Sequence, residues 1–116
     1  FVPVVCDYYS GMQVLVPLDL KLAGTSAEAV AAGIADYYKE GATVSVHALN
    51  EALPENGLYS NALSGSDRME LYMTVNAAGD QMMLVSLFDN LGKGSSGAAI
   101  QCMNLMLGMD ETEGLE

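Results

Sequence analysis

The spacing of apolar and polar positions changes several times along the chain, and each change marks a predicted element. Between Thr25 and Glu40, the apolar residues Val30 and Ile34, with Tyr37 or Tyr38, recur at helical spacing and predict one amphipathic helix. Runs of β-branched and other apolar residues predict four strands, at Met12–Leu22, Thr43–Leu49, Met69–Val75 and Gln81–Phe88. The last two strands flank a short glycine-containing connection and therefore predict a β-hairpin.

Proline, glycine and capping residues set the predicted boundaries. Pro17 lacks an amide donor, so its strand should lie at a sheet edge or contain a bulge or bend. The sequence Thr25-Ser26-Ala27-Glu28 has the form of a capping box with its threonine as N-cap, and Gly41 is the predicted C′ residue of that helix. His47 should lie on the opposite face of its strand from Val46, where a lone histidine is usually a surface or satisfied residue.

Residues 89–107 join a strand to a glycine-rich segment and then to a helix, an order that is common at anion- and nucleotide-binding sites. Gly92, Gly94 and Gly97 match the pattern G-x-G-x-x-G. A dinucleotide fold also needs a second parallel strand with an acidic residue about 20 residues further on, and none follows here. The remaining interpretation is a flexible loop that carries one cation, Lys93, at a helix N-terminus.

On the residues alone, two readings of Asp89-Asn90 stay open. Asx residues commonly begin turns, or the Asn90 amide offers a donor and an acceptor to a planar polar ligand. The helix that follows, from about Ser96 to Leu107 with Ser95 or Ser96 as N-cap, is apolar nearly all round and should be buried on more than one side. The acidic tail, residues 110–116, is expected to fray.

These elements predict one α+β domain over residues 1–116, with a mixed, mostly antiparallel sheet and helices on one side. Residues 1–10 should be extended, and residues 50–67 are the least regular stretch. A chain of 116 residues with 51% hydrophobic residues is long enough for a modest core. The low charged fraction indicates that a partner or a further domain covers part of the surface.

The charge balance narrows the classes of partner. The net charge is −11, and only four Lys and Arg residues are present, which argues against nucleic acid and anionic membranes. No stretch reaches the ~20 apolar residues of a membrane span. Cys6 and Cys102 are interpreted as buried, reduced thiols of a cytoplasmic protein, and with His47 the only histidine no metal site is expected.

The sequence DNLGKGSSGAAIQ, from Asp89 to Gln101, with the following MNLMLG, closely resembles the C-terminal signature of N-acetyl-gamma-glutamyl-phosphate reductases. Upstream, Phe1-Val2-Pro3, Gly11-Met12 with Val16-Pro17-Leu18, and the segment LSGSDRM before the hairpin are also similar to that family, in its shorter variant. The resemblance spans nearly the whole chain and is most specific over the last twenty residues.

The resemblance implies a C-terminal catalytic and dimerisation domain like that of glyceraldehyde-3-phosphate dehydrogenase, preceded in the intact enzyme by a Rossmann domain that binds NADP. It implies an enzyme of arginine biosynthesis that reduces N-acetyl-gamma-glutamyl phosphate, a small-molecule substrate, to a semialdehyde with NADPH, and that forms a homo-oligomer. By the same resemblance, Asn90 approaches the nicotinamide carboxamide, and the neighbouring residues Leu91, Lys93 and Gly94 border the cofactor.

The catalytic residues of such enzymes have no counterpart here. The family's nucleophilic cysteine lies in N-P-G-C-Y-P-T, which this sequence does not contain, and its histidine lies upstream of the segment matched by Phe1. We therefore expect residues 1–116 to be inactive alone and active in the intact enzyme. Asp67 and Cys102 stand where the family has asparagine, which leaves polar contacts there open. The alternative is a freestanding acidic dimerisation or binding domain without catalysis.

Overall fold

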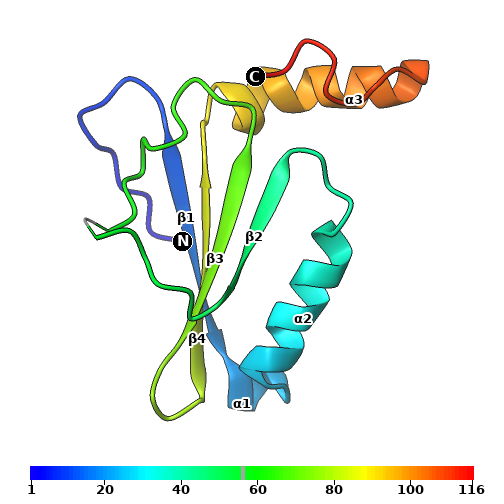
Figure 1. Ribbon diagram of the computed structural model, residues 1–116. Coiled ribbons are helices and arrows are strands. Elements are labelled where there is room, and N and C mark those ends of the chain that lie inside the picture. Colours follow the sequence, from blue (N-terminus) through cyan, green and yellow to red (C-terminus); the bar gives the residue numbers. More distant parts are fainter. Residues whose placement is uncertain (56) are drawn as a thin grey trace.

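A computed structural model describes residues 1–55 and 57–116 and contains one four-stranded sheet (Figure 1). The strands follow the order β1-β4-β3-β2, in which β1 and β3 both pair antiparallel with β4 while β2 pairs parallel with β3. Their bounds are β1 Met12–Asp19, β2 Val44–Leu49, β3 Met69–Val75 and β4 Gln81–Phe88. The predicted α+β class and the mixed, mostly antiparallel sheet are therefore confirmed.

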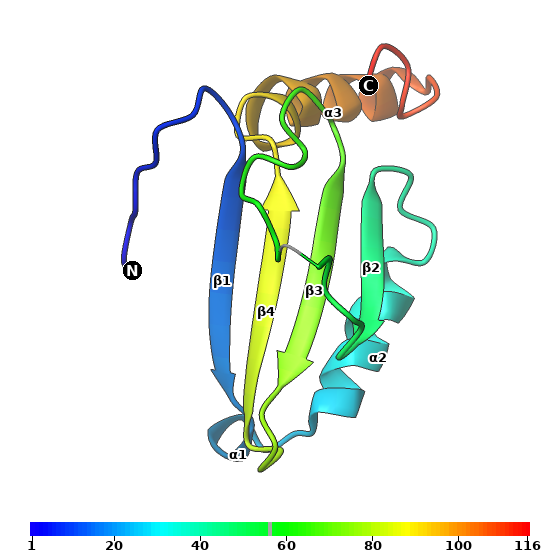
Figure 2. The same cartoon turned by 60° about the vertical axis from the view of Figure 1, so that its left-hand side comes forward.

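Four helical segments accompany the sheet, with bounds α1 Leu20–Ala23, α2 Ala27–Tyr38, the π-helix η1 Gly92–Ser96 and α3 Gly97–Leu107. Helix α2 lies on one face of the sheet, behind the strands in Figure 2, whereas the segment between β2 and β3 crosses the opposite face. Helix α3 lies across the end of the sheet at which β1 begins and β4 ends, in both views. Among the described helices, none is long and apolar enough to cross a membrane.

The core lies between the sheet and the two helices α1 and α2. Leu20, Ala27, Met73 and Met82 are all at least 97% buried and form its centre. The half-buried residues packed around them come from α2 and from all four strands: Leu18, Val30, Ala31, Ile34, Val46, Leu49, Val75 and Leu84. Since Val30 and Ile34 are among them, the predicted buried face of α2 is confirmed; of the two tyrosines, Tyr38 is half-buried and Tyr37 exposed.

The strand predicted over Met12–Leu22 is three residues too long. Its chain leaves the sheet at Asp19, where the carboxylate Oδ1 accepts the Leu22 amide at 2.9 Å and caps the short helix α1. Gly24 then ends α1 in the left-handed conformation, with φ 65°. Pro17 lies in β1, an edge strand, as its missing amide donor predicts.

Two predicted boundaries of α2 are wrong. Ser26, rather than Thr25, is the N-cap, and its hydroxyl accepts the Ala29 amide at 3.2 Å. The helix ends at Tyr38 with Lys39 as C-cap, and Gly41, which does not adopt positive φ, follows one residue beyond C′. The hairpin strands, by contrast, have the predicted bounds, with the turn glycine, Gly79, at φ 71°.

The thiols, the last helix and the tail also depart from expectation. Cys6 and Cys102 are exposed rather than buried. Helix α3 buries only Gly97 and Asn104, and its apolar side chains face outward, with Met106 87% exposed. The tail does not fray, because it folds back along α3 and ends beside its first turn (Figure 1). Periodicity predicted burial here because α3 is apolar, but the described residues do not cover its apolar side chains.

Candidate functional site at the end of the sheet

Asp89 joins three segments at the end of the sheet that α3 crosses. Its side chain is 3% exposed, and it follows directly after the last residue of β4. Carboxylate Oδ2 accepts the Gly65 amide at 2.6 Å and the Ser10 hydroxyl at 3.4 Å, while Oδ1 accepts the Leu91 amide at 3.0 Å. One buried carboxylate therefore connects the start of β1, the irregular segment and the chain that leaves β4.

The hydrogen bonds of Asp89 also keep it ionised. Burial alone would raise the pKa of this carboxyl group, but the amides of Leu91, Gly65 and Gly92 and the Ser10 hydroxyl outweigh that effect, so that the pKa lies below its ordinary value. A charged acceptor is consequently present at this position at neutral pH. The Ser10 hydroxyl has a second partner, the hydroxyl of Ser64.

Asn90 lies next to this carboxylate, and a distant amide fixes its side chain. Its Oδ1 accepts the backbone N–H of Gly11 at 2.8 Å. Gly11 has φ 115°, and a Cβ there would lie 2.5 Å from the Asn61 Cα, so only glycine fits this close approach. With Oδ1 engaged, the Asn90 Nδ2 group is left as a donor that has no acceptor among the described residues. The following side chain, Leu91, is 44% exposed.

The glycine-rich segment is helical, which corrects the prediction of a flexible loop at a helix N-terminus. Residues 92–96 form one π-helical turn that continues into α3 without a break. The Gly94 amide donates to the Asp89 carbonyl at 2.8 Å, and the Ser96 amide donates to the Leu91 carbonyl at 3.1 Å. Ser96 precedes α3 without capping it, since its hydroxyl donates to the Leu91 carbonyl at 2.8 Å. These amides are engaged within the turn and do not form an open anion cradle.

Close packing accounts for the two glycines of η1 and for Gly97, the first residue of α3. A Cβ on Gly97 would lie 1.9 Å from the Asp67 carboxylate oxygen Oδ1, and one on Gly92 would lie 2.6 Å from the Ser66 carbonyl oxygen. A Cβ on Gly94 would lie 2.9 Å from the Phe88 ring. The pattern Gly92, Gly94, Gly97 therefore reflects how tightly the turn packs on residues 66–67 and on the end of β4.

Lys93 points inward rather than toward solvent. Its ammonium group donates to the Thr43 hydroxyl at 2.7 Å and to the Gln101 side-chain oxygen at 2.5 Å. Both partners are neutral, and no carboxylate of the described residues pairs with this cation. Lys93 therefore ties η1 to the residue that precedes β2 and to the second turn of α3.

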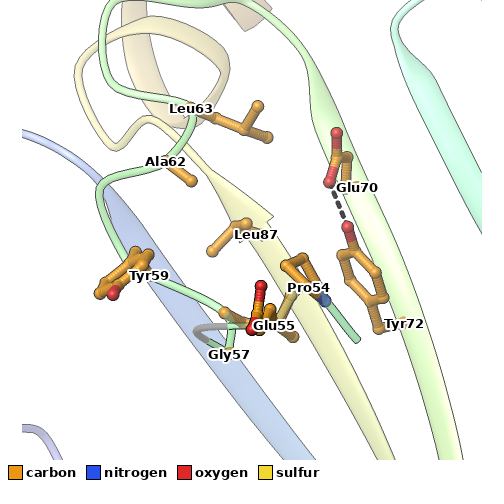
Figure 3. Close-up of a pocket in the computed structure, with 10 residues that line it drawn as sticks. Pro54, Glu55, Gly57, Tyr59, Ala62, Leu63, Glu70, Tyr72 and Leu87 are labelled. Atoms are coloured by element: carbon orange, nitrogen blue, oxygen red, sulfur yellow. Dashed lines mark hydrogen bonds between the residues drawn. The ribbon is translucent and has the colours of Figure 1, made fainter. Parts of the chain in front are cut away.

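A second concave region lies on the face of the sheet that α2 does not cover. Its volume is about 310 Å³, and Figure 3 shows side chains of the irregular segment, including Tyr59 and Leu63, opposite Leu87 and Tyr72 of the strands. The Tyr72 hydroxyl donates to Glu70 at 2.7 Å. Burial, followed by the Glu70 carboxylate, raises the pKa of Tyr72 to about 12.

His47 lies on the same face of the sheet as Tyr72, as the strand alternation predicts. Its ring stacks on the tyrosine ring at 3.9 Å between centroids, and Nδ1 lies 2.8 Å from a Glu51 oxygen. Its Nε2 atom has no hydrogen-bond partner in the described part of the chain, and the nearest carboxylate oxygen, on Glu70, is 3.6 Å away. No three His, Cys, Asp or Glu side chains of the described residues are arranged to hold a metal ion.

The site residues inferred by resemblance are brought together only in part. Asn90 is bound to Gly11 through its oxygen and Leu91 is exposed beside it, whereas Lys93 and Gly94 are held in internal contacts. Two further residues of this region, Asp89 and Gly11, were not singled out as site residues. The signal for Asp89 was its position directly after a strand that ends in a turn.

The fold is consistent with the C-terminal domain of enzymes like glyceraldehyde-3-phosphate dehydrogenase. No family model matches the chain. Curated relatives do, and three of them are called N-acetyl-gamma-glutamyl-phosphate reductase. The chain is 41% identical over 110 residues to the protein of Burkholderia orbicola (strain MC0-3), 40% over 109 to that of Rhizobium meliloti (strain 1021) and 36% over 120 to that of Trichormus variabilis (strain ATCC 29413 / PCC 7937).

These matches cover 93%, 92% and 99% of this chain and 35%, 35% and 37% of the respective relatives. The chain thus spans about a third of the length of the curated relatives it matches. The matched stretch is their C-terminal region, and the resemblance to N-acetyl-gamma-glutamyl-phosphate reductases seen in the sequence is confirmed.

Proposed function

We propose that this chain is the C-terminal domain of a two-domain, NADPH-dependent reductase that converts N-acetyl-gamma-glutamyl phosphate to the semialdehyde in arginine biosynthesis. The relatives carry the name of that reaction. NADPH, when bound, would supply the hydride, and overall NADPH, a proton and the acyl phosphate would give the aldehyde, NADP⁺ and inorganic phosphate. This reading is favoured over a freestanding binding domain because similarity to the reductases extends along nearly the whole chain.

The single observation that carries the proposal is the side chain of Asn90. Its carbonyl oxygen is held by the Gly11 amide, so its NH2 group remains to donate to an outside acceptor. The carboxamide oxygen of a nicotinamide is an acceptor of that kind. The exposed side chain of Leu91 offers an apolar contact beside it. Lys93, through its side chain, and Gly94, through its backbone amide, hold the η1 turn in place and thereby support Asn90 and Leu91.

The chemistry at the acyl group is proposed to use a cysteine nucleophile and a histidine general acid and base that lie outside residues 1–116. Cys6 and Cys102 are both exposed, on the N-terminal segment and on α3, and His47 lies on the edge strand β2, whereas Asn90 follows β4. None of the three therefore takes a catalytic role in the proposal. The role of this domain is to complete one wall of the cofactor site.

The outer surface fits a protein that buries it elsewhere. The exposed apolar residues of α3, such as Met106 and Leu107, are suited to pack on the proposed Rossmann domain, and this domain is proposed to take part in a homo-oligomer. A biosynthetic enzyme of this type is expected in the cytoplasm.

The test is a chimera in which residues 1–116 replace the matching segment of the Burkholderia orbicola reductase. We expect NADPH oxidation that depends on the acyl phosphate. In this chimera, Asn90→Ala should raise KM for NADPH by about tenfold, the effect of one lost hydrogen bond to a ligand of about 1.4 kcal/mol. Asn61→Ala, which changes an exposed asparagine next to Gly11, is the matched control. A folded chimera without turnover would refute the function, and an unchanged KM in Asn90→Ala would refute the contact.

A further inference from the structure

The C-terminal segment, residues 110–116, is anchored where a frayed tail was expected. Asn104 of α3 is 1% exposed, and its side-chain nitrogen donates to the carbonyl oxygens of Glu113 at 2.8 Å and Glu111 at 3.3 Å. Gly108 ends α3 with φ 69° and turns the chain back on itself. The segment then runs back over α3 to the first turn of that helix (Figure 1).

Its last residue pairs with the segment that precedes β3. The Asp67 amide donates to the Glu116 carbonyl at 2.7 Å, and the Glu116 amide donates to Asp67 Oδ2 at 3.1 Å. The Ser66 hydroxyl adds a bond of 3.3 Å to the same carbonyl. The other carboxylate oxygen, Asp67 Oδ1, occupies the space that a Cβ on Gly97 would need. Asp67 thus lies between the end of the chain and the junction of η1 with α3.

A second chain of contacts reaches the opposite side of η1. The Glu111 carboxylate accepts the Gln101 side-chain amide at 3.2 Å, and the Gln101 oxygen accepts the Lys93 ammonium group. Lys93 also donates to Thr43, which is buried at the start of β2. The tail therefore contacts η1 by two routes, one through Asp67 and one through Gln101, and η1 begins two residues after Asn90.

We propose that residues 110–116 are a positioning element that holds the η1 turn, and through it Asn90, in the geometry of the proposed cofactor wall. The functional part of this inference rests on the proposed reductase activity. The structural part does not, because it concerns only the stability of η1 against local opening. Asp67 is the positioning residue of the first route, and it acts through the backbone of η1 without touching the cofactor.

The structural part is tested by amide hydrogen exchange on the 116-residue chain. The Gly94 and Ser96 amides, which donate within η1, report local opening of the turn. Asp67→Ala and a chain lacking residues 110–116 should each raise their exchange rates by about tenfold or more, which corresponds to the loss of hydrogen bonds worth about 1.4 kcal/mol or more. The Asn76 amide in the hairpin should keep its rate. Asp67→Asn, which retains an acceptor oxygen, should restore protection.

Asp36→Ala removes a carboxylate from an exposed pair with Lys39 on α2 and is the matched control, for which no rate should change. If the shortened chain fails to fold, Asp67→Ala alone decides. Unchanged exchange at Gly94 and Ser96 in Asp67→Ala would overturn the proposal, and so would an equal acceleration at Asn76, which would indicate a global loss of stability.

In the chimeric reductase, Asp67→Ala should raise KM for NADPH several-fold while kcat changes less, because a displaced η1 weakens cofactor contacts without touching the nucleophile. A several-fold loss in kcat with an unchanged KM for NADPH would contradict a positioning role. A chimera that is inactive with wild-type residues 1–116 refutes the proposed function, but the exchange result on the isolated chain would still stand or fall by itself.

Discussion

Asp89→Asn is the substitution whose effect follows most directly from the structure. An asparagine keeps the shape of the side chain but offers one acceptor oxygen where the carboxylate offers two. Either the Gly65 amide or the Leu91 amide would then face an NH2 group instead of its acceptor, and one buried donor would be left unpaired. An unpaired buried donor lowers the free energy of unfolding by about 1–3 kcal/mol, and the remaining hydrogen bond has a neutral acceptor in place of a charged one. Relief of the buried charge offsets part of this, so we expect a net loss of roughly 2 kcal/mol.

The assay is urea unfolding followed by circular dichroism, with the free energy of unfolding compared between the variant and the wild type. Asp36→Asn is the control, because it removes the same charge from an exposed pair whose contribution should be small. The pH dependence adds a second signature. Since folding lowers the pKa of Asp89, its stabilisation is fully present above the ordinary aspartate pKa of about 3.9 and is lost as pH falls through the lower, folded-state value.

The difference between wild type and Asp89→Asn should therefore be full near pH ~7 and shrink below pH ~4. A loss no larger than that of Asp36→Asn at neutral pH would refute the assigned role of the Asp89 hydrogen bonds. A difference that stays constant through the acidic range would refute the role of its charge.

Three further outcomes follow from close contacts and burial. Gly97→Ala should destabilise the chain by roughly 1–3 kcal/mol in urea unfolding, because its Cβ would meet the Asp67 carboxylate. Gly33→Ala, in open space on α2, should instead stabilise the chain by up to ~1 kcal/mol. Equal changes in the free energy of unfolding would contradict the close packing at Gly97. Met82→Ala should cost about 2–5 kcal/mol and Met83→Ala clearly less, since only the first is in the core. In an alkaline absorbance titration, Tyr72→Phe should lose one phenol, the one whose pKa is about 12. Because folding raises that pKa, the free energy of unfolding of the wild type should fall between pH ~10 and ~12, and that of the variant should fall less.

Local pattern predicted the parts of the fold that local physics determines. The hairpin strands have the expected bounds because both periodicity and the turn sequence specify them, and Pro17 lies in an edge strand because its missing donor excludes a central one. Asp19 as an N-cap and Gly24 as a C-cap glycine were readable signals for α1, but the apolar run around them favoured a longer strand.

The arrangement around Asn90 depends on contacts between residues that are far apart in the sequence. Glycines 92, 94 and 97 have the composition of a loop, yet they lie in helical segments, where Ser66, Asp67 and Phe88 leave no room for a Cβ. The orientation of Asn90 comes from an amide 79 positions earlier in the chain, that of Gly11. The apolar pattern of α3 predicted burial, but no surface of the described residues covers that helix.

The most direct test of the central claim is the turnover of the chimeric reductase that carries wild-type residues 1–116. The measurement compares NADPH consumed and phosphate released, with and without N-acetyl-gamma-glutamyl phosphate. The account predicts consumption only with the acyl phosphate, in one-to-one ratio with phosphate, and at a rate within about tenfold of the parent enzyme, a factor that corresponds to about 1.4 kcal/mol in the barrier. A correctly folded chimera that binds NADPH but shows no dependence on the acyl phosphate would contradict it.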